Sequence, residues 1–278
     1  MKSIDYNQFL ALNLPEPEFI LNPVIPAQGF LMVHAYRGVG KTHVSLGIAH
    51  AVATGGELFG WSAKHPSKVL FVDGEMAAYD LRQRLSWFGQ RPREGFFRII
   101  TPDLQEAQSP GLSTDEGRAQ LEAQLGDAKL IVLDNLSTLF NFRDENSGEE
   151  WARIQPWLLS LRRRGFAVLL VHHSGKGGKQ RGTSKREDVL NNVIHLSPPP
   201  DYKQSMGCVM DVSLEKGRML FGDNAGTFRA SLRVENGLAV WDIKSAEELA
   251  EETKERRQKE QGENVNALAK ALAEALRG

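Results

Sequence analysis

The chain has 278 residues, of which 41% are hydrophobic and 25% are charged, and its formal net charge is -1. This is the balance of a folded soluble domain, and the length is enough for one large α/β domain or two small ones. The near-neutral charge excludes a histone-like basic protein, although a local basic patch could still bind nucleic acid.

Cysteine content and hydropathy restrict the chain further. The single cysteine, Cys208, excludes a disulfide framework and a multi-cysteine metal site, and it fits a reducing compartment. No apolar run approaches the roughly 20 residues that span a bilayer. The segment 1–10 has no apolar signal-peptide core. We therefore expect a cytoplasmic protein without a membrane partner.

The sequence pattern divides the chain into three parts. Residues 1–28 are rich in proline, which blocks continuous helix and strand pairing, so they predict an irregular N-terminal arm that lies on a domain. Residues 29–244 predict the domain itself. Residues 245–278 predict a charged helical C-terminal tail, whose final apolar positions suit either a small docking contact or a frayed end without a role.

Within 29–244, mainly apolar runs alternate with stretches of helical periodicity. Such runs are typical of strands buried on both faces. The runs lie at 30–35, 68–73, 97–101, 129–134 and 166–171, and the helical stretches at 41–54, 76–89, 114–126 and 149–164. From about residue 190, strand-like segments follow one another with only turn signals between them. The pattern predicts an α/β fold: a mainly parallel sheet with helices on both faces and an antiparallel hairpin extension on the C-terminal side.

The first apolar run leads into AYRGVGKT and then into a helical stretch, which is the context of a phosphate-binding loop. Glycines let successive backbone N–H groups turn toward an anion, and the helix N-terminus adds partial positive charge. Lys41 would reach the β- and γ-phosphates of ATP, and the Thr42 hydroxyl would bind Mg²⁺. The motif departs from its usual form in one place, where Ala35 replaces the first glycine. The predicted nucleotide-binding residues are Ala35, Tyr36, Arg37, Gly38, Val39, Gly40, Lys41 and Thr42.

Two acidic residues, Asp73 and Glu75, stand at and just after the end of the run at 68–73. Ligands of an open parallel sheet bind at the carboxyl ends of its strands. We expect this strand to lie beside the phosphate-binding strand, so Glu75 is the predicted base that activates water. Asp73 is the rival, although an Asp-Gly pair before a helix is more typical of a turn or cap. Glu75 also fits a surface acid in the first turn of a helix.

Polar residues also stand at the ends of the runs at 129–134 and 166–171. LIVLD has the Walker B form, and its Asp134 is predicted to bind Mg²⁺ near Thr42. His172 and His173 end the next strand. Because adjacent strand residues point to opposite faces, His173 is the one predicted to sense the γ-phosphate, and the pair is not expected to hold a metal.

In this order, AYRGVGKT, FVDGEM, LIVLD and LLVHHSGKG resemble the motifs of RecA-like P-loop ATPases. Over about 20–245 the chain is similar to the small hexameric replicative helicases of the plasmid RepA kind and to related mobile-element ATPases. Glu75 in its strand-end position, HHSGKG and the later RGTS carry that likeness. The resemblance implies a RecA-like core and a homo-oligomeric ring, a hexamer in that branch, with ATP bound between subunits.

The branch usually takes a trans-acting arginine from just after RGTS, but residues 189–192 contain none. The segment EKGR before FGDNAG is instead similar to the Lys-x-Arg hairpin of DnaB-type and KaiC-type ATPases. That likeness implies that Lys216 and Arg218 reach the γ-phosphate bound by a neighbouring subunit, where positive charge assists phosphoryl transfer. The alternative is a hairpin whose basic residues are merely solvated.

Two segments are candidates for contact with single-stranded DNA. One follows Asp134, and the other, 174–186, follows His173 and combines glycines with cations. In the RecA family these positions carry DNA-contacting loops, and in a ring they would line the pore and bind the nucleic-acid backbone. A loop that only closes over ATP is the alternative. The predicted nucleic-acid-binding residues are Arg143, Lys176, Lys179, Arg181, Lys185 and Arg186.

These features predict a ring motor that hydrolyses ATP with Mg²⁺ and acts on single-stranded DNA. The leading hypothesis is a replicative DNA helicase of a plasmid or mobile element, with replication or loading proteins as partners. One alternative is a RecA-fold switch or helicase loader that binds a protein partner without unwinding. Another is a recombination or repair ATPase.

Overall fold

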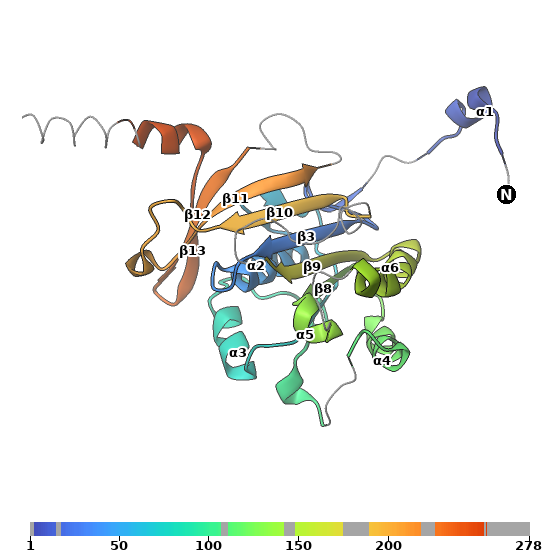
Figure 1. The fold of residues 1–278 in the computed structure, drawn as a ribbon, viewed down its shortest axis with the longest axis horizontal. Helices are drawn as coiled ribbons and strands as arrows, with labels where there is room; N and C mark the ends of the chain where they lie inside the picture. Colours follow the sequence, from blue (N-terminus) through green and yellow to red (C-terminus); the bar gives the residue numbers. More distant parts are fainter. Residues whose placement is uncertain are drawn as a thin grey trace, which may run out of the picture.

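The computed structural model describes residues 3–14, 18–106, 111–141, 148–174, 189–217, 226–252 and 254. A nine-stranded sheet forms its centre (Figure 1). Its strands are β3 (Phe30–Ala35), β6 (Val69–Asp73), β7 (Phe97–Ile100), β8 (Leu130–Asp134), β9 (Ala167–His173), β10 (Asn192–Ser197), β11 (Cys208–Gly217), β12 (Phe228–Glu235) and β13 (Leu238–Lys244).

The strands run in the order β13-β12-β11-β10-β3-β9-β8-β6-β7. Those from β10 to β7 are parallel, whereas β11, β12 and β13 pair antiparallel. The predicted α/β fold is confirmed, including the antiparallel extension. The extension starts one strand later than expected, because β10 is parallel to β3 and only its partner β11 reverses direction.

Helices cover both faces of the parallel strands. They are α2 (Lys41–Thr54), α3 (Ala78–Ser86), α4 (Asp115–Leu125), α5 (Leu136–Phe140) and α6 (Gly148–Arg163). Leu31 and Val33 pack toward α2, whereas Phe30 and Met32 pack toward α4, α5 and α6. This alternation follows from the period of a strand, whose successive side chains point to opposite faces. As predicted, every residue of β3, β6 and β8 is buried.

The beginning of the chain differs from the expected irregular arm. Strands β1 (Phe19–Leu21) and β2 (Ile25–Pro26) pair as an antiparallel hairpin, and Leu21 and Ile25 are buried in the core beside α2. A small two-stranded sheet tolerates the proline because few of its N–H groups have to pair. Before this hairpin, α1 (Tyr6–Leu10) has no buried residue, and Figure 1 shows it apart from the body of the protein.

The order of the strands corrects one sequence-based expectation. Strand β6, which leads to Glu75, does not lie beside β3, because β9 and β8 are inserted between them. The alternation of strands and helices along the sequence predicts parallel pairing, but it does not set which strands become neighbours.

The segment after Asp134 is also more ordered than expected. It begins as α5, whose Leu136 and Phe140 are buried. The start of this segment is therefore part of the core and cannot serve as an open DNA-binding loop. Its predicted contact, Arg143, lies outside the described residues.

Smaller elements complete the described structure. They are the hairpin of β4 (Glu57–Leu58) with β5 (Trp61–Ser62), and the 3-10 turns η1 (Pro102–Leu104) and η2 (Gln204–Met206). Residues 246–252 and 254 are helical, and the rest of the predicted helical tail lies outside the described residues. None of the described helices has the length and apolar character needed to cross a membrane.

Candidate nucleotide-binding site

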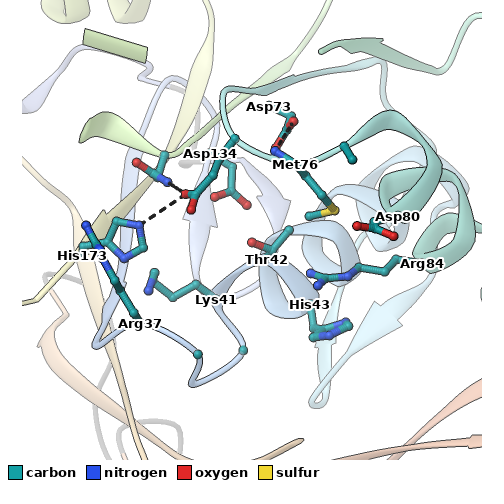
Figure 2. A pocket seen from close by; sticks show the side chains of 15 residues that line it. Arg37, Lys41, Thr42, His43, Asp73, Met76, Asp80, Arg84, Asp134 and His173 are labelled. Atoms are coloured by element: carbon teal, nitrogen blue, oxygen red, sulfur yellow. Dashed lines mark hydrogen bonds and ion pairs between the residues drawn. The ribbon is translucent and has the colours of Figure 1, made fainter. Parts of the chain in front are cut away.

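A cleft of about 420 Å³ opens at the carboxyl ends of the parallel strands (Figure 2). Open parallel sheets bind their ligands at this edge. The lining residues come from the β3–α2 turn, from the ends of β6, β8 and β9, and from α2 and α3. They are Arg37, Gly38, Gly40, Lys41, Thr42, His43, Asp73, Glu75, Met76, Ala77, Asp80, Arg84, Asp134, Asn135 and His173.

The turn between β3 and α2 forms one wall of the cleft. At Gly40 the backbone has φ 118°, and a Cβ would lie 2.6 Å from Met210 Cε and 3.1 Å from Cys208 Sγ. The positive φ favours glycine at this position, and a side chain here would also displace Met210 of β11, which packs against the turn. Gly40 caps α2 without a side-chain hydrogen bond. The first N–H groups of α2 have no intrahelical partners, which is the arrangement that binds a phosphate.

Lys41 supplies a positive charge at the turn. Its Nζ donates hydrogen bonds to the carbonyl oxygens of Ala35 and Tyr36, both at 3.1 Å. The side chain is only 6% exposed, so its ammonium group is held beside the cleft. A buried ammonium in this position is suited to binding an anion, because the local dielectric is low.

The Asp134 carboxylate and the Thr42 hydroxyl meet in the cleft. Asp134 accepts a hydrogen bond from Ser45 Oγ at 2.7 Å and another from the Thr42 side chain. Burial raises the pKa of Asp134, while these hydrogen bonds and the charge of Lys41 lower it. Mg²⁺ prefers oxygen ligands and retains waters, so these two side chains fit it together with substrate phosphates. In the described part of the chain, no group of three or more His, Cys, Asp and Glu residues could hold a metal by itself.

Glu75 lies between two other polar side chains of the cleft. Its Oε2 accepts a hydrogen bond from Asn135 Nδ2 at 2.6 Å and lies 3.6 Å from His173 Nε2. The Glu75 side chain is 62% exposed, which leaves it open to water. Burial and the nearby Lys41 lower the pKa of His173, so its ring is mainly neutral at pH 7, although Glu75 acts in the opposite direction. A carboxylate fixed by an amide and open to water can act as a general base.

Asn135 was not predicted as a site residue. Besides its bond to Glu75, it caps α5, because its Oδ1 accepts a hydrogen bond from the Thr138 backbone N–H at 3.2 Å. An Asn directly before a helix is a recognisable cap in sequence. Its contact with Glu75 joins residues 60 positions apart, so the sequence pattern gave no sign of it.

Asp73, the rival base, has structural partners. Its Oδ2 accepts hydrogen bonds from the Met76 backbone N–H at 3.0 Å and from the Thr101 hydroxyl at 3.3 Å. Burial raises the pKa of Asp73 to about 6, and the charge of Asp134 on the adjacent strand adds to this effect. These contacts fix the turn before α3 and favour the predicted turn role.

The cleft continues from the turn toward α3. Figure 2 shows His43, Asp80 and Arg84 on the side opposite His173 and Arg37. The His43 ring stacks on Trp87 with centroids 5.9 Å apart. Burial, with a smaller effect of Arg84, lowers the pKa of His43 to about 4. The sequence motifs identified none of these residues. Because the cleft extends to them, it has room for a ligand longer than a phosphate.

The remaining predicted residues lie elsewhere. Ala35 is buried in β3, Tyr36 is exposed and Val39 packs against the core, so the turn contributes only part of its predicted set to the cleft lining. Lys216 lies on β11 and does not line this cleft. The predictions that fall outside the described residues are Arg218, Arg143, Lys176, Lys179, Arg181, Lys185 and Arg186.

Comparisons with known proteins agree with this architecture. Residues 2–179, well over half of the chain, match a family described as an AAA domain. No curated protein matches the sequence. A KaiC-like protein of the hyperthermophilic archaeon Pyrococcus horikoshii OT3, known from its crystal structure, aligns at 18% identity and a TM-score of 0.55, covering 80% of this chain and 93% of that protein. The chain therefore belongs to the AAA domain family of P-loop NTPases and has a RecA-like and KaiC-like fold.

Proposed function

We propose that this protein is an ATP-hydrolysing ring motor that acts on single-stranded DNA, a DNA helicase of a plasmid or mobile element. The observation that carries the proposal is that Lys41, Asp134 and Glu75 meet in one cleft although they come from the carboxyl-end regions of three different strands, β3, β8 and β6. This arrangement supports the proposal, because it brings together a cation that could bind phosphate, a carboxylate that could bind Mg²⁺ and a carboxylate that is open to water.

Each of these side chains has a part in hydrolysis. The turn at Gly38 and Gly40 would bind the phosphates of ATP, and Lys41 would move from its carbonyl partners to the β- and γ-phosphates. Mg²⁺, held by Thr42 and Asp134, would neutralise phosphate charge. Glu75 would accept a proton from the attacking water while its bond to Asn135 keeps the carboxylate in place.

The DNA-dependent part of the proposal is supported by the position of His173. His173 is the last residue of β9, and its side chain contacts Glu75. It is followed almost directly by the basic, glycine-rich stretch 175–186. Loss of the γ-phosphate at His173 would therefore act on a segment whose charge suits a nucleic-acid backbone. The location of Lys216 outside its own cleft is compatible with action on a neighbouring subunit.

A second candidate is a loader or switch that binds a protein partner without unwinding DNA. The exposed apolar side chains of α1 favour it, since Tyr6, Phe9 and Leu10 are all more than half exposed. Exposed apolar patches often mark contact sites for other proteins.

ATPase assays with and without single-stranded DNA separate the two candidates. For the motor we expect turnover to rise several-fold with DNA, and we expect the double variant Lys179→Ala with Arg181→Ala to lose this stimulation. The matched control is Arg91→Ala with Arg93→Ala, which removes two exposed cations near the far edge of the sheet. Strand displacement on forked DNA would support a helicase. Stimulation only by a protein partner would favour the loader.

Glu75→Gln tests the assignment of the base. The variant should still bind ATP but hydrolyse it about a hundredfold more slowly, because an amide cannot accept the proton. Glu57→Gln makes the same change at an exposed position outside the cleft lining; it is the control and should retain the activity. Wild-type turnover in Glu75→Gln would transfer the role to Asp73.

Mixed rings test the trans-acting hairpin. Arg218→Ala subunits keep the phosphate-binding turn, and Lys41→Ala subunits keep the hairpin. Neither should hydrolyse ATP alone, and a mixture should regain part of the activity if the hairpin acts on its neighbour. A monomer with full activity would contradict the ring.

A further inference from the structure

A stacked pair of histidines, one buried and one half-buried, lies behind the turn that is proposed to bind phosphate. His34, on β3, is fully buried, and its ring stacks on His195 of β10 with centroids 4.7 Å apart and planes at 14°. His34 is a polar residue in a strand that is otherwise apolar or small. Buried polar groups lower stability unless they are hydrogen-bonded, so both ring nitrogens need partners.

Both nitrogens of His34 have partners from distant parts of the chain. Nδ1 lies 2.8 Å from Ser174 Oγ, and Nε2 lies 2.7 Å from Glu215 Oε2. Since a carboxylate only accepts, Nε2 donates to Glu215, and in the neutral ring Nδ1 accepts from the Ser174 hydroxyl. The hydrogen bond from His34 lowers the pKa of Glu215, which keeps this carboxylate ionised. His195 Nδ1 contacts the other oxygen of Glu215 at 3.6 Å.

These partners occupy informative positions. Ser174 directly follows His173, the residue beside Glu75 in the cleft. Glu215 directly precedes Lys216. His34 itself precedes Ala35, whose carbonyl oxygen holds Lys41. One buried imidazole therefore joins the end of β9, the root of the phosphate-binding turn and the strand that carries Lys216.

The arrangement is unsuited to chemistry of its own. Ser174, His34 and Glu215 form a hydrogen-bonded series, but Ser174 is buried and its hydroxyl is occupied by His34. An apolar residue in place of His34 would pack this part of the sheet without burying polar groups. A structural role alone therefore gives no reason for three polar side chains at this junction.

We propose that His34 is a positioning residue, which together with Ser174 and Glu215 couples the γ-phosphate side of the cleft to the position of Lys216. This inference rests on the proposed function, in which Lys216 acts on the ATP of a neighbouring subunit. Movement at the end of β9 would pass through the two hydrogen bonds of His34 to β11. Small displacements of a reacting or stabilising group lower rates strongly.

The test compares steady-state ATP turnover with ATP binding in the full-length protein. Glu215→Leu removes the acceptor for His34 and should lower kcat about tenfold without changing the affinity for ATP. Glu215→Gln, whose amide oxygen can still accept, should restore most of the rate. His34→Asn loses the bond to Glu215 and should resemble Glu215→Leu, whereas His34→Gln keeps a donor near the Nε2 position and should lose less. The double variant His34→Asn with Glu215→Leu should be no slower than either alone.

Two further variants complete the set. His195→Phe keeps the stacked ring and removes only the weak ion pair, so it should turn over ATP at the wild-type rate. Lys216→Ala gives the full effect of losing the hairpin lysine. Wild-type kcat in Glu215→Leu and His34→Asn, alongside a slow Lys216→Ala, would overturn the coupling and leave the proposed function intact. If Glu215→Leu and His34→Asn lowered both the affinity for ATP and the melting temperature, and Glu215→Gln did not restore them, the cluster would have only a structural role. That result would also overturn the coupling. A folded wild-type protein without ATPase activity would overturn the proposed function, and the coupling with it.

Discussion

The parallel and antiparallel halves of the central sheet are built differently. In the parallel half, every residue of β3, β6 and β8 is buried, and helices cover both faces. In the antiparallel half, the outer strands expose large apolar side chains, among them Val234, Leu238, Val240 and Ile243. Parallel sheets need cover on both faces, whereas antiparallel sheets can leave one face open. The covered half thus holds the cleft residues rigidly, and the open half supports the turn through Met210 and carries Lys216.

The largest expected difference between the halves is chemical. Asp134→Asn, at the end of a parallel strand, should lower ATP hydrolysis about a thousandfold, equivalent to about 4 kcal/mol, because the carboxylate proposed to bind Mg²⁺ is lost. Asp242→Asn makes the same change on β13 and should leave hydrolysis near the wild-type rate. Turnover measured over a range of Mg²⁺ concentrations checks both variants. If both variants lost the same share of the hydrolysis rate, the chemistry would not be confined to the edge of the parallel strands.

Stability should show the same division. Leu169→Ala creates a cavity in β9, where the side chain is fully buried, and should lower the free energy of unfolding by about 3 kcal/mol. Val240→Ala, at a position that is 39% exposed on β13, should lower it by less than about 0.5 kcal/mol. Urea unfolding of the two variants measures the difference. Similar losses would show that the antiparallel half is covered in solution, for example by another subunit.

Asp73→Asn sharpens the comparison at the cleft. Burial raises the pKa of Asp73 from 3.8 to about 6, so the folded state favours the neutral carboxyl. The stability that the neutral form contributes is complete below about pH 4 and is lost as the pH rises through about 6. Asn, which is neutral at every pH, should therefore stabilise the protein by about 1–2 kcal/mol at pH 7.5, and this gain should vanish near pH 4.

Thermal unfolding of wild type and Asp73→Asn across this pH range measures the effect. Asp127→Asn is the control, because its carboxylate is exposed and its pKa is lowered by Lys68. If Asp73→Asn were less stable than the wild type at pH 7.5, this result would contradict a raised pKa of the Asp73 carboxyl.

The smallest effect is expected at the solvent-exposed end of the antiparallel half. Lys244 on β13 forms an ion pair with Glu252 at 2.6 Å, and both side chains are well exposed. Surface ion pairs contribute little, so Lys244→Met should change the free energy of unfolding by less than about 0.5 kcal/mol. Chemical unfolding at low and high salt checks this, and a loss above 1 kcal/mol would show that the pair is shielded from solvent.

The sequence predicts the parallel half better than the contacts that join distant segments. Helix α2 begins at Lys41 and ends at Thr54 as predicted, and β3 spans the predicted 30–35, because a glycine turn and a helical period are local signals. The positions of Lys41, Asp134 and His173 at one edge follow from parallel pairing.

Other features could not be predicted because they depend on the order of the strands. The insertion of β9 and β8 between β3 and β6 has no local signal. The contacts of His34 with Ser174 and Glu215 join residues 140 and 181 positions apart. The β1–β2 hairpin was missed for a different reason, since its prolines indicated an irregular chain, whereas burial against α2 stabilises pairing there.

The central claim is that the β3–α2 turn binds the phosphates of ATP through Lys41. Calorimetric titration of the folded protein with a non-hydrolysable ATP analogue and Mg²⁺ tests it most directly. We predict saturable binding of one analogue per chain, weakened at least about tenfold by Lys41→Ala, which removes a charged partner of the phosphates. Absence of binding by the folded wild-type protein, or equal affinity in Lys41→Ala, would contradict the account.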